Sequence, residues 1–269
     1  MFKTVTLGED QFHVELRGEG PPLLLVHGFP LDHHMWDDLA KLLESDFRLI
    51  IPDLRGFGQS TGFNEEAAMP QMAVDLERLL EGLEIQESVT FCGLSMGGYV
   101  GWQFWKNHRS HIERLILMDT KAVADSDEQK KGRHETAQQV LAEGMQALPE
   151  KMIPKLLAEQ TIAERPEVVK ALSEMIIRQR PQGVAAALRG MAHRADVTNW
   201  LADIDLPVLV ICGEHDAISP PEEMAEIANN IPAANYAEIP GAGHMSPMEA
   251  PEQVAQAIRE FFEPADENE

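Results

Sequence analysis

The sequence predicts an α/β protein with a mostly parallel sheet of about eight strands, helices on both faces and an inserted helical cap. Two observations predict this class. Over residues 1–120, apolar runs alternate with segments whose apolar residues recur at helical spacing. Over residues 126–200 the strand-like runs stop and helical spacing alone remains, before strands return. We therefore divide the chain into a core at 1–120 and 201–269 and a cap at 121–200.

The first core segment alternates strands with helices. Residues 3–7 and 11–16 alternate apolar and polar side chains around a turn at 8–10, which is typical of a hairpin. Continuous apolar runs, as in a parallel sheet buried on both faces, predict strands at residues 21–26, 47–51, 88–92 and 113–118. Helical spacing between them predicts helices at residues 32–43, 69–83 and 96–106.

The cap and the second core segment are interpreted in the same way. Prolines, which start helices well and interrupt them, divide the cap into four expected helices at residues 128–147, 149–161, 166–179 and 182–192. Strands return at residues 207–212 and 234–239, and a final apolar stripe predicts a helix at residues 251–262. We expect the acidic end, residues 263–269, to be disordered.

The composition is ordinary for a globular enzyme except for its charge. A formal net charge of −23 argues against nucleic acid and anionic membrane surfaces as partners. The two cysteines, Cys92 and Cys212, end apolar runs, so we expect buried thiols and no disulfide. No apolar run approaches the roughly 20 residues that span a bilayer. Residues 1–16 lack a signal-peptide pattern, so we expect a cytoplasmic protein.

A G-x-S-x-G sequence at residues 93–97 lies between an expected strand and an expected helix. A serine on such a turn is held in a strained backbone conformation with its hydroxyl exposed. The glycines leave room for the turn, and the following helix directs the positive end of its dipole at the same position. We therefore predict that Ser95 is a nucleophile; the alternative is a glycine-rich turn that caps a helix.

A serine nucleophile needs a base, and the base needs an acid on its far ring nitrogen. Among ten histidines, His244 lies in a loop after the last strand, at the sheet edge where Ser95 is expected. Asp216 follows the strand that ends at Cys212, and we predict that it is the acid. Asp119, at the end of another strand, is the competing acid or a polar residue at the hinge of the cap.

The developing oxyanion needs backbone N–H donors, which we expect at Met96, after the nucleophile, and at Phe29. Gly28 allows the loop before Phe29 to turn tightly, and we expect His27 to hold the shape of that loop. We expect His33 and His34 to be solvated; the alternative is that they line the pocket.

We expect the substrate pocket to lie between the Ser95 turn and the cap. Its expected lining consists of Gly28, Phe29, Met96 and Trp102 from the core and cap methionines such as Met145, Met152, Met175 and Met191. These methionines also suit the core of the cap. The sequence contains no metal-ligand cluster, phosphate loop or dinucleotide fingerprint, so we expect no cofactor and no metal.

With these segments in order, the chain resembles the α/β-hydrolase superfamily over nearly its whole length. The resemblance is carried by residues 27–30 (HGFP), 53–60 (DLRGFGQS), 93–98 (GLSMGG), 213–216 (GEHD) and 241–244 (GAGH). Within the superfamily the chain is most similar to small-cap carboxylesterases and 3-oxoadipate enol-lactonases. The resemblance implies Ser95 as nucleophile, His244 as base and Asp216 as its partner. Haloalkane dehalogenases and epoxide hydrolases place an aspartate at the position of Ser95, so the serine argues against their chemistry.

The resemblance implies a serine hydrolase that cleaves short to medium acyl or aryl esters through an acyl-enzyme. The expected partner is therefore a small-molecule ester or lactone. The same residues also serve lactonases, perhydrolases and carbon–carbon bond hydrolases, because the shape of the pocket decides among them. A function of another class stays open, namely a small-molecule sensor that keeps these residues and acts through a protein partner bound to its cap.

Overall fold

A computed structural model describes residues 1–263 of the chain and confirms the predicted α/β class. Residues 264–269 of the end predicted to be disordered lie outside the described residues. Within the described part, eight strands form one sheet in the order β1-β2-β4-β3-β5-β6-β7-β8. β2 pairs antiparallel with β1 and β4, and all other neighbours pair parallel. The strands are β1 (Phe2–Leu7), β2 (Asp10–Arg17), β3 (Pro22–Val26), β4 (Arg48–Pro52), β5 (Val89–Leu94), β6 (Ile112–Met118), β7 (Val208–Gly213) and β8 (Ala234–Ile239).

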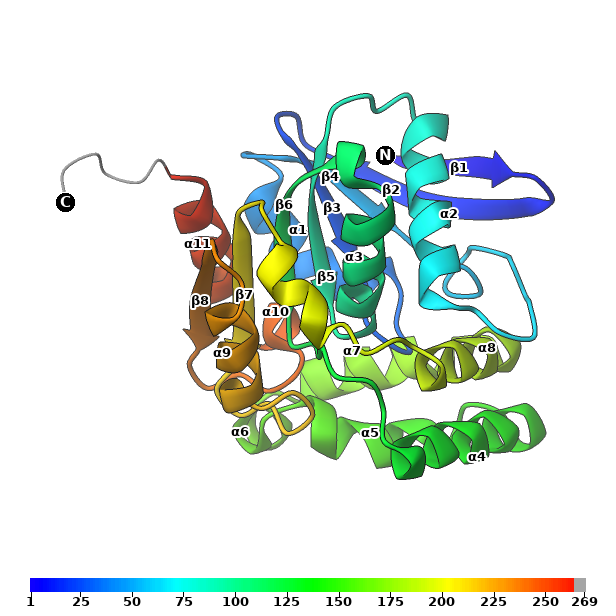
Figure 1. Ribbon diagram of the computed structural model, residues 1–269. Coiled ribbons are helices and arrows are strands. Elements are labelled where there is room, and N and C mark those ends of the chain that lie inside the picture. Colours follow the sequence, from blue (N-terminus) through cyan, green and yellow to red (C-terminus); the bar gives the residue numbers. More distant parts are fainter. Residues whose placement is uncertain (264–269) are drawn as a thin grey trace.

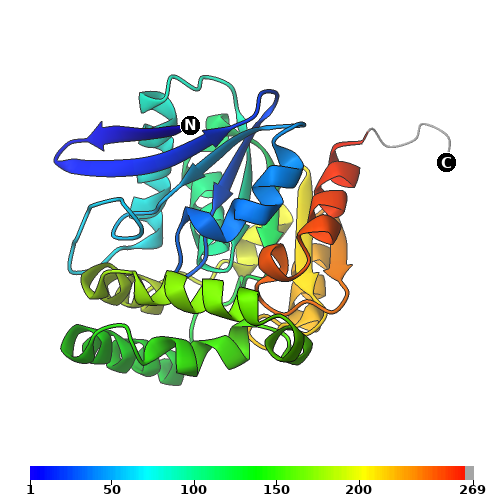
Figure 2. The same cartoon turned by 180° about the vertical axis from the view of Figure 1, so that it is seen from behind.

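Helices cover both faces of the sheet, as Figures 1 and 2 show from opposite sides. One face carries α2 (Met69–Gly82), α3 (Met96–Asn107) and α9 (Pro221–Asn229), and the other carries α1 (Asp37–Leu43) and α11 (Pro251–Phe262). Shorter elements are η1 (His33–Trp36), η2 (Arg109–His111), η3 (Thr198–Asp203) and α10 (Ser246–Glu249). Because both faces are covered, β3, β5 and β7 are buried at every residue. None of the described helices has the length and apolar character that crossing a membrane requires.

The cap is an insertion of five helices between β6 and η3, all of it within the described residues, where the sequence analysis expected four. They are α4 (Asp127–Glu143), α5 (Leu148–Leu156), α6 (Glu159–Glu164), α7 (Pro166–Ile177) and α8 (Pro181–Ala192). In Figure 1 they form a layer below the sheet. The helix predicted at 149–161 is divided because Glu249 of α10 accepts hydrogen bonds from the Ala158 N–H (2.8 Å) and the Thr161 hydroxyl (2.7 Å).

The cap is held against the core by an ion pair and by close backbone packing. Arg178, which follows α7, donates two hydrogen bonds of 2.8 and 2.6 Å to the buried carboxylate of Asp32. Gly183 of α8 lies against the turn at Gly56, so that a Cβ on Gly183 would lie only 1.9 Å from the Gly56 carbonyl oxygen. Glycine is therefore required where α8 meets the core.

We expect Gly183→Ala to lower the free energy of unfolding by about 1–3 kcal/mol, because the added methyl group forces α8 away from the Gly56 turn. Gly132→Ala is the matched control, since Gly132 lies in α4 with open space around its Cβ position. That substitution should raise the free energy of unfolding by about 0.4–1 kcal/mol through lower entropy of the unfolded chain. Urea unfolding measures both variants, and equal stabilisation by both would contradict the packing of α8.

Candidate active site

Ser95 occupies a strained turn between β5 and α3. Its φ of 54° and ψ of −109° lie in a region that residues other than glycine rarely adopt. The Ser95 N–H donates to the Met118 carbonyl oxygen (2.8 Å), and a Cβ on Gly97 would lie 2.2 Å from the Val26 carbonyl oxygen. Among residues 91–100, Ser95 alone is partly exposed. The turn therefore presents this hydroxyl to the space outside the sheet.

His244, in the loop after β8, is joined to Asp216, in the loop after β7. A hydrogen bond of 2.8 Å connects His244 Nδ1 with Asp216 Oδ2. The other carboxylate oxygen of Asp216 accepts the N–H groups of Ile218 (2.7 Å) and Ser219 (3.0 Å). Burial opposes the charge on Asp216, but His244 and these two N–H groups hold its pKa below the usual value. Asp216 is thus a charged acceptor that fixes the orientation of the His244 ring.

Asp119, the competing acid of the sequence analysis, has different partners. Within the described residues its hydrogen bonds connect it to the Gly213 N–H (2.8 Å) and the Ser246 hydroxyl (2.7 Å), not to His244. Its side chain is fully buried, and this burial and the negative charge of Asp216 raise the pKa of Asp119 well above its ordinary value. Asp119 therefore connects the end of β7, which precedes Asp216, to α10, which follows His244.

The two residues expected to supply oxyanion donors are the neighbour of Ser95 in the chain and a residue of the same cavity. Met96 is the first residue of α3, and Phe29 lines the same cavity as Ser95. Within residues 1–263, the backbone N–H groups of Phe29 and Met96 have no hydrogen-bond acceptor. Free N–H groups at a helix amino terminus and in an adjacent loop can donate to an anionic oxygen.

The histidines near this loop have structural partners. His27 accepts the Leu54 N–H through Nε2 (3.0 Å), and its Nδ1 lies 2.9 Å from the Gly28 carbonyl oxygen, so it holds the loop as predicted. The expected solvated position of His33 is wrong, because its ring is buried and bonded to Asp53 (Nδ1–Oδ1, 2.7 Å). Burial opposes both charges, but the ion pair raises the pKa of His33 and lowers that of Asp53.

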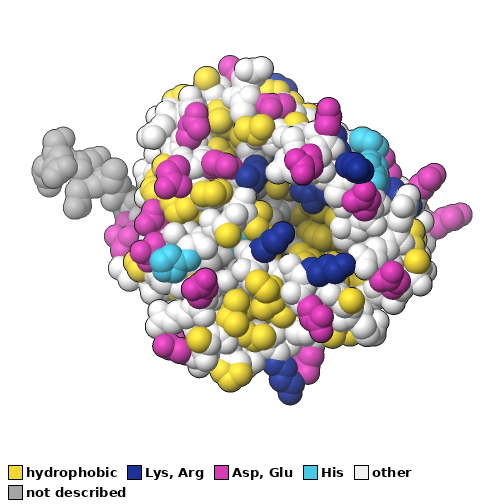
Figure 3. All heavy atoms as spheres, turned by 90° about the horizontal axis from the view of Figure 1, so that it is seen from below, with side chains coloured by type: hydrophobic (Ala, Val, Ile, Leu, Met, Phe, Trp, Pro, Cys, Tyr) yellow, Lys and Arg dark blue, Asp and Glu magenta, His cyan; other side chains and the backbone are white. Residues whose placement is uncertain are grey.

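Ser95 and His244 line one cavity of about 450 Å³ between the core and the cap. Its apolar lining consists of Phe29, Leu148, Met152, Leu156, Leu188, Met191 and Ile218. Its basic lining consists of Arg133, Lys151 and Lys155. Figure 3 views the cap face and shows Lys and Arg side chains around a hollow with apolar side chains inside it.

Of the eight residues expected to line the pocket, three line this cavity, namely Phe29, Met152 and Met191. The other five do not, namely Gly28, Met96, Trp102, Met145 and Met175. The Trp102 indole N–H donates to the Lys121 carbonyl oxygen (3.1 Å), and Met145 is buried in the hydrophobic core. Gly28 lies against Leu94, which a Cβ on Gly28 would approach to 2.8 Å. The sequence pattern assigns these residues to helices or loops, but it does not reveal which side of each helix or loop faces the cavity.

The basic residues and Tyr99 were missed by the sequence analysis. A signal for two of them was present, because Lys151 and Lys155 recur four residues apart on an otherwise apolar helix face. Nothing in the sequence shows that this face of α5 meets Ser95.

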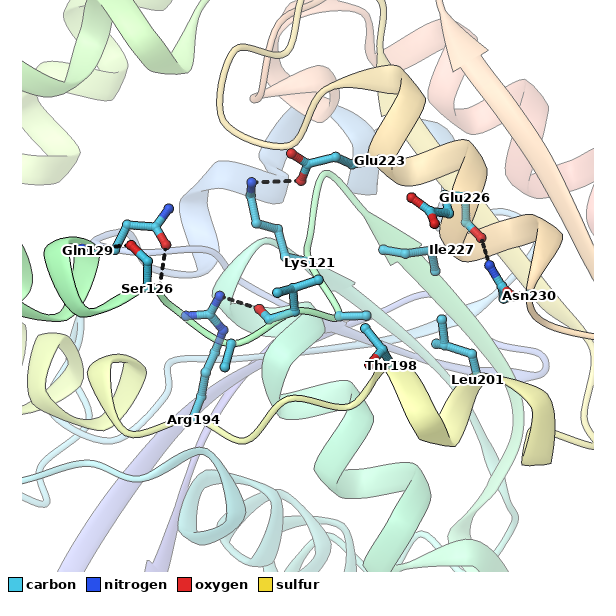
Figure 4. Close-up of a pocket in the computed structure, with 13 residues that line it drawn as sticks. Lys121, Ser126, Gln129, Arg194, Thr198, Leu201, Glu223, Glu226, Ile227 and Asn230 are labelled. Carbon is cyan, nitrogen blue, oxygen red and sulfur yellow. Dashed lines mark hydrogen bonds and ion pairs between the residues drawn. The ribbon is translucent and has the colours of Figure 1, made fainter.

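A larger cavity of about 610 Å³ lies beside the chain crossings into and out of the cap (Figure 4). Lys121 pairs there with Glu223 (2.8 Å), and Arg194 donates to the Val123 carbonyl oxygen (2.8 Å). Gln129 lines both cavities, but neither Ser95 nor His244 lines the larger one. The cavity that Ser95 and His244 line is therefore the smaller of the two.

Comparison with known proteins places this geometry in a family. The model described as the alpha/beta hydrolase fold matches residues 21–251. An esterase from Thermogutta terrifontis, in a malate-bound structure, shares 44% sequence identity with a TM-score of 0.94 over 97% of each chain. The enol-lactonase from Burkholderia xenovorans shares 28% identity with a TM-score of 0.89, over 96% of this chain and 99% of that chain.

One relative found by sequence is also an enol-lactonase. The 3-oxoadipate enol-lactonase 2 of Acinetobacter baylyi is 26% identical over 242 residues, which are 90% of this chain and 88% of that protein. The sheet order and the helical insertion after β6 agree with the family match over residues 21–251. The chain belongs to the α/β-hydrolase family, and the relatives named above are esterases and enol-lactonases.

Proposed function

We propose that the protein is a serine hydrolase that cleaves carboxylic esters. The observation that carries the proposal is that a strained, partly exposed Ser95 and an Asp216-bonded His244 line the same cavity. In the proposed reaction, Ser95 attacks the ester carbonyl carbon while His244 takes its proton. The oxyanion accepts hydrogen bonds from the N–H groups of Phe29 and Met96.

The second half of the reaction reuses the same groups. His244 gives its proton to the departing alcohol, and Ser95 keeps the acyl group as an ester. His244 then takes a proton from water, whose oxygen attacks the acyl carbon, and gives that proton to the Ser95 oxygen as the bond to the acyl group breaks and the acid leaves. The negative charge of Asp216 stabilises the imidazolium ion that forms twice in this cycle.

A lactonase is the second candidate, because the chain matches an enol-lactonase over 96% of its length at 28% identity. A lactone is a cyclic ester, so the same residues would open it and release one hydroxy acid. The related esterase from Thermogutta terrifontis has malate bound, which supports a small-molecule ligand for this protein as well.

We expect steady-state hydrolysis of p-nitrophenyl acetate and butyrate, and falling rates for long acyl chains that exceed a cavity of about 450 Å³. A panel of p-nitrophenyl esters and five- and six-membered lactones, measured for kcat, tests the esterase and the lactonase together. Stoichiometric labelling by a fluorophosphonate, located on Ser95 by mass spectrometry, checks the nucleophile. Release of a single equivalent of product without further turnover would favour a small-molecule sensor.

A further inference from the structure

Positive charge gathers around the candidate active-site cavity, although the chain has a net charge of −23. Arg133, Lys151 and Lys155 line it, and among the described residues Asp125 is the one carboxylate that does so. In Figure 3, Lys and Arg side chains surround the hollow, while most Asp and Glu side chains on this face lie farther out. A cleft lined by one sign of charge concentrates ligands of the opposite sign.

The charges of Arg133 and Asp125 are already satisfied. Asp125 pairs with Arg133 and also with Arg194 (2.5 Å). Burial opposes the charge on Asp125, but these two guanidinium groups lower its pKa, so the carboxylate stays ionised. The negative charge in the cavity lining is therefore compensated from within the protein.

The two lysines lack such partners. Lys151 donates to the neutral amide oxygen of Gln139 (2.8 Å). In the part of the chain that the structure describes, neither Lys151 nor Lys155 forms an ion pair with a carboxylate, whereas the cap lysines 130, 131 and 170 do. Their ammonium groups thus carry uncompensated charge at the mouth of the cavity.

The lysines share one face of α5 with apolar residues. Leu148, Lys151, Met152, Lys155 and Leu156 follow helical spacing, and all of them line the cavity. Leu148 and Leu156 are buried, and the two lysines are exposed. A ligand lying along this face would meet apolar side chains deep in the cavity and two ammonium groups at its mouth.

We infer that Lys151 and Lys155 bind a carboxylate of the substrate, so that the protein acts on half-esters of dicarboxylic acids. This inference rests on the proposed function and names its substrate class. A dicarboxylate fits better than inorganic phosphate, because the apolar residues Leu148, Met152 and Leu156 beside the two lysines can contact a methylene chain that phosphate lacks. The apolar side chains between mouth and nucleophile suit the methylene chain that connects the two ends of such a substrate.

Paired substrates test this inference. Monoethyl adipate carries a carboxylate where ethyl hexanoate carries a methyl group, and acid release in a pH-stat measures kcat/KM for each. We expect the wild-type protein to prefer the half-ester. Lys151→Gln and Lys155→Gln should each lower the ratio of the two kcat/KM values about 10-fold, since each removes one charged contact. Lys170→Gln, an exposed cap substitution outside the cavity, should leave the ratio unchanged.

Binding without turnover separates this inference from the proposed function. Calorimetry with adipate and Ser95→Ala protein should show binding that weakens about 10-fold for each lysine variant and also weakens as salt rises from about 0.05 to 0.5 M. Inorganic phosphate should bind more weakly than adipate.

The possible results distinguish a failure of the carboxylate site from a failure of the hydrolase proposal. The carboxylate site would be overturned if the ratio of kcat/KM for monoethyl adipate to that for ethyl hexanoate were equal in the wild-type protein and both lysine variants. Tighter binding of phosphate than of adipate would also overturn it. Either result would leave the hydrolase proposal intact. Lysine-dependent binding of adipate by a protein that hydrolyses no ester would support the site and remove the hydrolase proposal.

Discussion

Ser95→Ala should lower kcat for p-nitrophenyl acetate by about 10⁶-fold, because the variant has no oxygen that can form the acyl-enzyme. The loss should concern chemistry and not folding. The turn is fixed by backbone hydrogen bonds and by the glycines around position 95, and alanine keeps the Cβ atom of serine. Steady-state kinetics and circular dichroism on the same preparation measure the two properties.

The control for this experiment is Ser88→Ala. The Ser88 hydroxyl is exposed, donates to the Ser110 carbonyl oxygen (3.0 Å) and does not line the cavity. Its loss should leave kcat within twofold of the wild-type value, an expected change below about 0.5 kcal/mol. Undiminished turnover by Ser95→Ala, at rates that contaminating enzymes could not supply, would remove the proposed nucleophile.

Asp216→Asn should lower kcat by about 10⁴-fold while the protein stays folded. An amide in place of the carboxylate can present its NH₂ group to His244 Nδ1, which stabilises the wrong ring tautomer and leaves Nε2 unable to accept the serine proton. The amide also cannot stabilise the imidazolium ion. Ester hydrolysis followed over pH 5–9 measures the loss.

Asp119→Asn is the matched comparison, because both substitutions change one buried carboxyl into an amide. Its activity loss should be much smaller, since the asparagine can still accept the Gly213 N–H and donate to the Ser246 hydroxyl. A greater activity loss for Asp119→Asn than for Asp216→Asn would transfer the role of acid to Asp119.

Asp119→Asn should also change stability with a defined pH dependence. The pKa of Asp119 is raised in the folded protein, so the folded state binds more protons than the unfolded state above the ordinary carboxyl pKa. The contribution of Asp119 to the free energy of unfolding therefore falls as the pH rises above the ordinary carboxyl pKa. We expect Asp119→Asn to be more stable relative to the wild-type protein at pH 8 than at pH 4, as measured by urea unfolding.

The sequence predicted the fold class and most of the strands correctly. Continuous apolar runs predicted β3, β5, β6 and β7, because strands buried on both faces admit few polar residues. It missed α9, although Pro221 at its start and the apolar spacing of Met224, Ile227 and Ala228 were signals of a helix.

Contacts between distant segments account for most of the remaining differences. The break between α5 and α6 depends on Glu249, which lies 91 residues after Ala158. The burial of His33 depends on Asp53, whose carboxylate compensates an imidazole that would otherwise favour water. Local propensity contains no information about either partner.

The sequence by itself determined that Ser95, Asp216 and His244 each follow the end of a strand, and parallel strands bring their carboxyl ends to one edge of the sheet. Only the tertiary structure decided which acid bonds to His244 and which face of each cap helix meets the cavity. The uncompensated charges of Lys151 and Lys155 belong to this second kind of property. The physical reason is that a repeat of 3.6 residues fixes the faces of a helix relative to one another, whereas packing against other segments fixes what each face contacts.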